Sequence, residues 1–235
     1  MKKNAFWNGA IVLTALCVTL ASCVKDPSDE GEGETSKKKH VMNGHEYVDL
    51  GLPSGLMWAT CNVGASSPEG YGDFFAWGET SPKESYTWDT YKWGTGSNPS
   101  KYNETDNKTT LDLADDAARQ NWGGGWRMPT KEEWDELWTN CSKTWTAKEG
   151  VNGYLLSGTN GNSLFLPAAG HYGGFGANEN GSYWSSSFYT YDPNRPDHSW
   201  KPERAFYVNI GSFFVVRDGH DLRYMGNSVR PVCLP

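Results

Sequence analysis

The sequence lacks the features that identify nucleic-acid-binding, membrane-spanning and zinc proteins. Lysine and arginine number 21 against 28 acidic residues, so the net charge is −7 at pH 7, whereas a nucleic-acid-binding protein is expected to carry a basic patch. The five cysteines include no closely spaced pair of the kind that zinc sites use. The apolar run at residues 11–20 is shorter than the ~20 residues of a transmembrane helix. We therefore expect no nucleic-acid partner, no metal and no cofactor.

Motifs of catalysis are missing as well. The Gly-rich stretch NWGGGW, residues 121–126, precedes no Lys-Ser or Lys-Thr of a phosphate-binding loop. None of the histidines stands beside a serine or cysteine in a known nucleophile motif; they are His40, His45, His171, His198 and His220. Carboxylate pairs for glycoside hydrolysis are distant in sequence, and 28 acids allow so many pairs that none is favoured. The sequence therefore predicts that the protein is not an enzyme.

The N-terminal segment has the pattern of a secretory signal peptide. Two lysines precede the apolar run, and small residues follow it, which predicts a signal peptide over residues 1–22. The tetrapeptide LASC resembles the bacterial lipobox, and this resemblance implies lipidation at Cys23 and a lipid anchor in the membrane. Residues 23–40 are polar, charged and rich in Gly and Ser, as in a flexible tether. We expect residues 41–235 to form a single domain.

Charged residues follow soon after the expected lipidation site, at Lys25-Asp26 and Asp29-Glu30. This arrangement resembles the surface-export signal of Bacteroidetes lipoproteins. It implies an outer-membrane lipoprotein exposed on the cell surface, with a periplasm-facing lipoprotein as the alternative.

The composition predicts a loop-rich domain with a core of large aromatic side chains. The chain has 12 Trp, 12 Tyr and 27 Gly, with a mean hydropathy of −0.67, and Trp and Tyr are also common at ligand-contacting surfaces. Cys61, Cys141 and Cys233 are an odd count for an exported domain. They allow either one disulfide with one free thiol or three reduced cysteines.

Two segments show helical patterns. The first, residues 109–124, places Leu113, Ala114, Ala117 and Ala118 on one face and ends at a glycine pair. The second begins at a capping box formed by Thr130 and Glu133. Its apolar residues recur at i, i+3, i+4 and i+7, which predicts a buried stripe; they are Trp134, Leu137, Trp138 and Cys141.

The remaining segments indicate short antiparallel strands. Residues 47–50 and 56–63 form an expected hairpin, and residues 80–109 an expected long ordered loop. Asn160-Gly161 between two apolar runs predicts a second hairpin. Strands are expected near residues 181–189, 204–210, 213–217 and 228–233, with turns at Gly211, Asp218-Gly219 and Gly226. The segment 213–216, FFVV, alternates its side chains between two faces, so we expect at least one phenylalanine to be exposed. The outline is an α+β domain.

Six motifs, in order, resemble the Fibrobacter succinogenes major paralogous domain of Bacteroidetes lipoproteins: GLPSGLMWATCNVGA, GDFFAWGET, DDAARQNWGGGWRMPTKEEWDEL, NGNSLFLPAAG, YWSSS and SVRPV. The resemblance covers about residues 41–232. It implies a C-type lectin-like fold, in which two helices flank a small twisted antiparallel sheet, as in formylglycine-generating enzymes and retroelement-diversified variable proteins. It also implies structural roles for Arg127 and Trp134 and inward-facing Val229 and Val232.

The same resemblance places ligand contacts in the C-terminal segment, outside YWSSS and SVRPV, and leaves open whether this segment is diversified. The residues so assigned are Phe188, Tyr189, Tyr207, Asn209, Phe213, Phe214, Arg217, Asp218, His220, Asp221, Arg223, Tyr224 and Asn227. Asp192, Asn194 and Asp197 cluster like calcium ligands but read better as a turn. The reactive cysteine pair of formylglycine-generating enzymes is not matched, because beyond residue 141 the chain has only Cys233.

These observations lead to three hypotheses of function. The first is a cell-surface lipoprotein whose domain binds a protein or glycan ligand without catalysis. The second is a structural or pilus-associated module of the cell envelope. The third is an oxidase of the formylglycine type that would depend on Cys233.

Overall fold

The computed structural model describes residues 40–234 except 104, 107 and 190–201, and these belong to one compact unit that begins at Lys38. The predicted signal peptide, Cys23 and the tether up to residue 39 lie outside the described residues, as do four side chains considered above, namely Asp192, Asn194, Asp197 and His198. His40, which we assigned to the tether, is already the first residue of a strand.

The architecture corrects the expected fold class. Strands account for 39% of the structure and helices for 12%, so the fold is mostly β rather than α+β, and the strands form several separate sheets. The C-type lectin-like layout, with two helices flanking one small sheet, is therefore wrong for this chain. One reason is that the first expected helix is largely absent, and another is that residues 142–167 build a sheet of their own.

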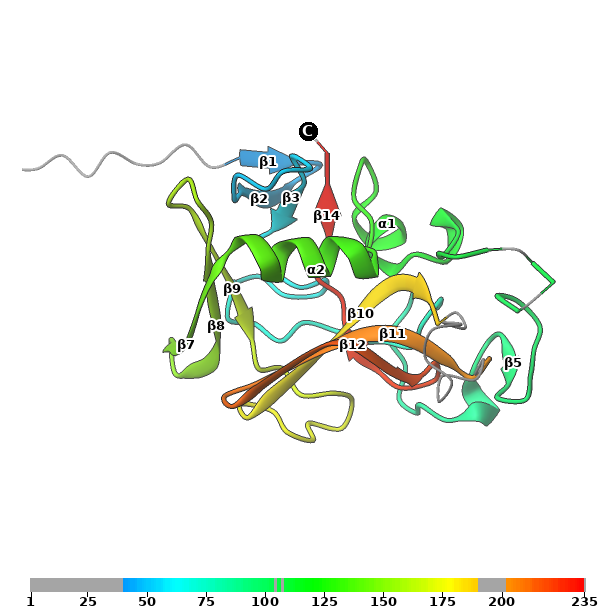
Figure 1. The fold of residues 1–235 in the computed structure, drawn as a ribbon. Coiled ribbons are helices and arrows are strands. Elements are labelled where there is room, and N and C mark those ends of the chain that lie inside the picture. The colour runs from blue at the N-terminus through cyan, green and yellow to red at the C-terminus, as the bar shows by residue number, and fades with distance from the viewer. Residues whose placement is uncertain (1–39, 104, 107, 190–201, 235) are drawn as a thin grey trace, which may run out of the picture. The chain divides into compact units, whose positions relative to one another are not determined.

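The strands pair in four sheets within the described part of the chain (Figure 1). A four-stranded sheet has the order β1 (His40–Met42), β2 (His45–Asp49), β3 (Met57–Ala59) and β14 (Val232–Cys233). A five-stranded sheet has the order β12 (Phe214–Leu222), β11 (Arg204–Gly211), β10 (Asn180–Phe188), β13 (Asn227–Ser228) and β4 (Phe74–Phe75). A three-stranded sheet contains β7 (Ser142–Lys148), β8 (Val151–Ser157) and β9 (Ser163–Pro167), and a small pair contains β5 (Gly94–Thr95) and β6 (Asn98–Pro99).

The first helical segment is split in two by an aspartate. A 3₁₀ turn, η2 (Leu113–Asp115), is followed by a short helix, α1 (Ala117–Trp122). Asp116 between them has extended backbone angles, and its carboxylate accepts hydrogen bonds from the backbone N–H groups of Arg119 and Met128. A buried carboxylate that binds backbone groups in this way ends one helix and caps the next. Consequently Leu113 and Ala114 are exposed, against the expected pattern.

The second helix, α2 (Lys131–Asn140), has the predicted start and the predicted apolar stripe. Thr130 and Glu133 form the capping box, and Arg127 binds the same Glu133 carboxylate with nitrogen–oxygen distances of 2.5 and 2.7 Å. Trp134, Leu137 and Trp138 are buried. The structural roles expected of Arg127 and Trp134 are therefore confirmed.

Replacing Thr130 with alanine is expected to lower the free energy of unfolding by about 1 kcal/mol, because the N–H of Glu133 loses its hydrogen-bond acceptor. Urea denaturation followed by tryptophan fluorescence measures this change. Thr139→Ala, at an exposed position of the same helix, serves as the control and should cost less than half as much. Equal losses for the two variants would show that the capping box does not stabilise the fold.

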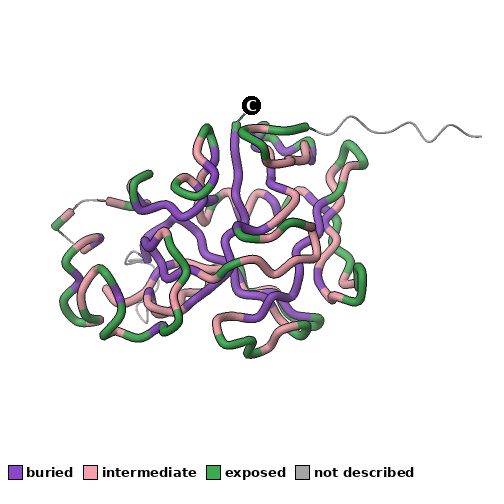
Figure 2. Tube along the Cα trace, turned by 180° about the vertical axis from the view of Figure 1, so that it is seen from behind, coloured by how far each residue is buried: buried purple, intermediate pink, exposed green. Residues whose placement is uncertain are grey.

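The core consists of two large aromatic and aliphatic clusters. One surrounds α2 and joins Trp58, Trp134, Tyr183, Val208 and Val232, so it connects the four-stranded and five-stranded sheets. The other gathers around Trp77, Trp126 and Trp184. The expected burial of Val229 and Val232 is confirmed, and the trace of this C-terminal segment is buried almost to its end (Figure 2).

Most of the expected hairpins are present. The strands β2 and β3 pair antiparallel, as do β8 and β9 around Asn160-Gly161. The turns near Gly211 and Gly226 also occur. The turn expected at Asp218-Gly219 is wrong, because β12 continues through it. Tyr207 faces Gly219 while Asn209 faces Val216, so two residues of β12 oppose the single residue Val208, which is a β-bulge.

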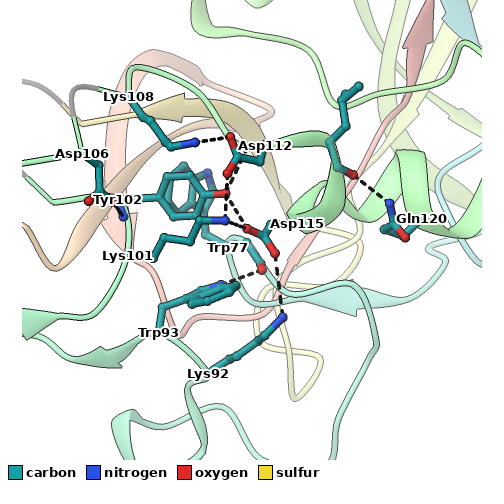
Figure 3. A network of polar contacts seen from close by, with 12 residues as sticks. Trp77, Lys92, Trp93, Lys101, Tyr102, Asp106, Lys108, Asp112, Asp115 and Gln120 are labelled. Atoms are coloured by element: carbon teal, nitrogen blue, oxygen red, sulfur yellow. Dashed lines mark hydrogen bonds and ion pairs between the residues drawn. The ribbon is translucent and has the colours of Figure 1, made fainter.

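Within the described part of the long segment 80–109, aromatic and charged side chains contact one another and two aspartates that follow the segment. Figure 3 shows the centre of this network, where Lys101 Nζ and the Tyr102 hydroxyl both contact Asp115 Oδ2, at 2.5 and 2.6 Å. Lys101 also pairs with Asp112 at 2.8 Å. Burial alone would lower the pKa of Lys101, but its hydrogen bonds to Asp112 and Asp115 raise that pKa overall. The network therefore fixes a region that has little regular structure.

Candidate ligand-binding surface

The outer hairpin of the five-stranded sheet, β11–β12, carries most of the predicted ligand residues. Within the described residues β12 is the outermost strand of this sheet. One face of the hairpin packs on the cluster around α2 through Val208, Ile210 and Val215. Because opposite residues of paired strands project to the same face, the other face carries Tyr207 and Asn209. Tyr207 packs against the other core cluster, around Trp77, Trp126 and Trp184, so the hairpin is supported on both faces.

The tip of this hairpin is apolar and exposed. Phe213 is 98% exposed, Phe214 47% and Val216 39%. Gly211 lies opposite Phe214, and a Cβ atom on Gly211 would come within 2.5 Å of the Phe214 ring, so this ring rests on the glycine backbone. We define the hairpin tip as Phe213, Phe214, Val216 and Arg217. Val216 was not among the predicted residues, although its place in FFVV follows the same alternation.

Aromatic side chains of the three-stranded sheet lie next to the tip. The Tyr154 hydroxyl of β8 donates to the carbonyl oxygen of Gly211 at 3.3 Å. The ring of Trp145 on β7 meets the ring of Tyr154 edge-on, with centroids 5.1 Å apart. Both side chains are half-buried. Sequence reasoning missed this neighbourhood because nothing local indicates that β7–β8 meets β11–β12.

A cluster of polar side chains lies on the other face of the hairpin. Asn209 Nδ2 donates to Ser182 Oγ at 3.3 Å, and Asn227 Nδ2 donates to Asp221 Oδ2 at 3.4 Å. The Oδ1 atoms of Asn209 and Asn227 are buried and have no hydrogen-bond partner within the described part of the chain. Burial raises the pKa of Tyr207, and the nearby charge of Asp221 also raises it. Four predicted residues thus meet here: Asn227 is buried, and Tyr207, Asn209 and Asp221 are half-buried.

Four predicted ligand residues are buried, which corrects their assignment to an exposed surface: Phe188, Tyr189, Arg223 and Asn227. The guanidinium of Arg223 lies 4.7 Å from the ring centroid of Phe188, and Tyr189 packs on Phe206 with ring centroids 5.2 Å apart. Arg223 was assigned to the ligand surface from the resemblance, yet it is buried and donates to the carbonyl oxygens of Lys101 and Tyr102 at 3.2 and 2.5 Å.

The other predicted residues vary in exposure. Arg217 and Asp218 are exposed at the bulge, and Arg217 Nη1 lies 3.5 Å from Thr139 Oγ1 of α2. His220 is half-buried, with its Nδ1 atom 3.3 Å from Arg204 Nη1. Tyr224 packs edge-on against Trp88, with ring centroids 4.8 Å apart. Of the thirteen predicted residues, four are exposed: Phe213, Phe214, Arg217 and Asp218.

A pocket of about 360 Å³ lies elsewhere, and sequence reasoning missed it. Its lining includes His45, Thr60, Cys61, Ser66, Pro68 and Trp122. The imidazole of His45 stacks on the indole of Trp122 with centroids 3.8 Å apart. Because burial disfavours the charged imidazole, the pKa of His45 is lowered. These residues come from three separate segments, so no local pattern could have indicated the pocket.

Three further observations bear on function. The described residues contain no cluster of three or more His, Cys, Asp and Glu side chains arranged to hold a metal ion. No helix in the described part combines the length and apolar composition that crossing a membrane requires. Comparisons with protein-family models, with curated proteins and with solved structures found no match for this chain.

Proposed function

We propose that the protein is a surface-anchored lipoprotein that binds a protein or glycan ligand without catalysis, and that the hairpin tip meets the ligand. The observation that carries this proposal is the almost complete exposure of Phe213, at 98%, beside the exposed Phe214 and Val216. Exposed apolar residues that gather in one place are typical of interaction sites, whereas single ones are ordinary.

The chemistry of the tip suits a ligand with apolar faces and polar edges. Phenylalanine rings pack on aromatic, aliphatic or sugar C–H surfaces, and the exposed guanidinium of Arg217 can donate several hydrogen bonds. The tip strand β12 is paired with β11, which in turn pairs with β10, and Arg217 reaches Thr139 of α2. A rigid hairpin loses little conformational entropy on binding, which favours affinity.

The anchor in this proposal rests on the lipobox-like sequence at Cys23, and the relation to the Fibrobacter succinogenes major paralogous domain rests on the six motifs. Mass spectrometry of the N-terminal peptide tests lipidation at Cys23. Protease treatment of intact cells tests location: surface exposure predicts removal of the domain, and protection until the cells are lysed would place it in the periplasm.

Binding is tested by displaying the full chain on cells and probing it with a glycan array and with bacterial-surface proteins. Exchanging Phe213 and Phe214 together for serine is expected to weaken binding at least about tenfold, because exposed aromatic residues often dominate binding energy. The matched control is Phe175→Ser, since Phe175 is 68% exposed in another loop. An equal loss for the control, or no loss for the double variant, would remove the hairpin tip as the site.

The two other hypotheses differ in their support. The outermost position of β12 favours a structural envelope module, because an edge strand can pair with a strand of a partner. Blank binding assays together with co-purification in an envelope complex would support that module. The oxidase hypothesis gains no support from Cys233, which is fully buried, and burial raises the pKa of its thiol to about 11.

A further inference from the structure

Arg230 is a buried cation without an acidic partner. Its side chain is fully buried, its Nε atom donates to Asn62 Oδ1 at 2.8 Å, and its Nη1 atom donates to the carbonyl oxygen of Ala59 at 2.9 Å. Both acceptors are neutral. Within the described part of the chain the guanidinium interacts electrostatically with Tyr183 and Cys61 and with no carboxylate. Its Nη2 atom has no hydrogen-bond partner among these residues.

A charge in this position is costly, because a charge that is removed from water has to be compensated. Burial lowers the pKa of Arg230, but a guanidinium keeps its proton inside proteins. The positive charge is therefore permanent. It needs a negative partner that the described residues around it do not supply.

Two other arginines show how this chain otherwise compensates a shielded guanidinium. Arg127 binds the carboxylate of Glu133 through two nitrogen–oxygen contacts, of 2.5 and 2.7 Å. Arg223 is buried like Arg230, but it lies against two aromatic rings and interacts electrostatically with the carboxylate of Glu203. Of these three arginines, Arg230 alone interacts with no carboxylate in the described part of the chain.

A second buried donor without a partner lies on the same side of the C-terminal segment. Ser228 is fully buried, and its hydroxyl has no hydrogen-bond partner among the described residues. Ser228 pairs with Tyr183 of β10, which belongs to the cluster around α2, whereas Val229 packs in the cluster around Trp77. Because side chains alternate along an extended segment, Ser228 and Arg230 both project to the side on which Tyr183 lies.

We propose that this buried site holds one small inorganic anion, such as chloride, between Arg230 Nη2 and the Ser228 hydroxyl. The anion would accept a hydrogen bond from each donor and neutralise the guanidinium. Neither residue lines the pocket of about 360 Å³ described above, and this enclosed position favours a single ion over a larger organic anion. The ion would join the C-terminal segment to β10 and to residues 59–62, so the stability of the fold would depend on the anion in solution.

The test follows thermal unfolding of the full chain by tryptophan fluorescence while sodium chloride replaces sodium gluconate at constant ionic strength. An ion that binds only the folded chain raises the unfolding midpoint by about 3–5 °C for each tenfold rise above its dissociation constant. We expect this response with chloride and with bromide. Crystals grown with bromide should show an anomalous scattering peak beside Arg230 Nη2.

Ser228→Ala separates a bound anion from an ordinary buried side chain. The change removes a donor that has no partner in the described part of the chain, so stability in gluconate should not fall, whereas the dissociation constant of chloride should rise about tenfold. The matched control is Ser186→Ala, because Ser186 is also buried but its hydroxyl donates to the carbonyl oxygen of Pro129 at 3.3 Å. The control should lower the midpoint equally in both salts and keep the chloride response.

Three results would overturn the proposal. The first is a midpoint of the natural chain that does not change when chloride replaces gluconate. The second is a chloride response of Ser228→Ala equal to that of the natural chain. The third is bromide at surface positions alone, which would mean an adventitious ion only. The hairpin tip shares no residue with this site, so these results are independent of the proposed ligand binding.

Discussion

Gly158→Ala is expected to lower the free energy of unfolding by about 3 kcal/mol, the upper end of what overpacking usually costs. Gly158 begins the turn between β8 and β9, and this turn docks on the segment after β2. A Cβ atom on Gly158 would lie 2.7 Å from the carbonyl carbon of Leu50 and closer still to its oxygen. Backbone cannot move aside as a flexible side chain can. The hairpin must therefore separate from the segment on which it rests.

The docking that would be lost is specific. Asn160 Nδ2 and Asn162 Nδ2 both donate to the carbonyl oxygen of Asp49, at 3.0 and 2.9 Å. Chemical denaturation measures the loss, and hydrogen exchange of β8 and β9 locates it. Gly125→Ala is the control, because the nearest atom there is the flexible Met42 sulfur at 3.2 Å. If both variants are equally stable, the close approach of Gly158 to Leu50 does not hold in solution.

Arg223→Ala is expected to cost about 3 kcal/mol as well, for a different reason. Its guanidinium is buried between the rings of Trp77 and Phe188, 5.0 and 4.7 Å from their centroids. It binds the carbonyl oxygens of Lys101 and Tyr102. Alanine would leave these two acceptors without a donor and a void between the rings, and buried unsatisfied groups cost about 1–3 kcal/mol each.

The measurement for Arg223 should also show where the damage occurs. Hydrogen exchange is expected to rise in residues 80–112, because Arg223 fixes that segment to the C-terminal part of the chain, while exchange in β8 and β9 stays unchanged. Arg119→Ala, at a half-exposed position of α1, should alter stability by less than about 0.5 kcal/mol. Uniform loss of protection across the domain would contradict a local role for Arg223.

Local patterns predicted the local structure well. The capping box, the stripe of Trp134, Leu137 and Trp138, and the Asn160-Gly161 hairpin depend on neighbouring residues, and all three are confirmed. The first helix was predicted with the same logic and was largely wrong. Propensity favoured a helix there, but the buried Asp116 carboxylate takes backbone partners at residues 119 and 128 and divides the segment. Tertiary hydrogen bonds outweighed the periodic pattern.

The candidate site was predictable in part. The alternation in FFVV indicated exposed phenylalanine, and the tip confirms that expectation. The resemblance placed Arg223 on the ligand surface, but its side chain is buried against partners that are more than 100 positions earlier in the chain, and no local pattern indicates such partners. The pocket beside Cys61 could not be predicted from the sequence for a related reason: its lining residues come together only after the sheets have paired.

The late position of β13 and β14 has a consequence for how the chain acquires its structure. β13 completes the five-stranded sheet between β10 and β4, and β14 completes the four-stranded sheet beside β3. Both main sheets therefore need residues 227–233 before they can close. Contacts between segments so far apart in sequence slow folding. Until residue 233 has been synthesised, neither main sheet can form completely, so the chain is expected to stay unfolded. An unfolded chain can be threaded through a secretion channel.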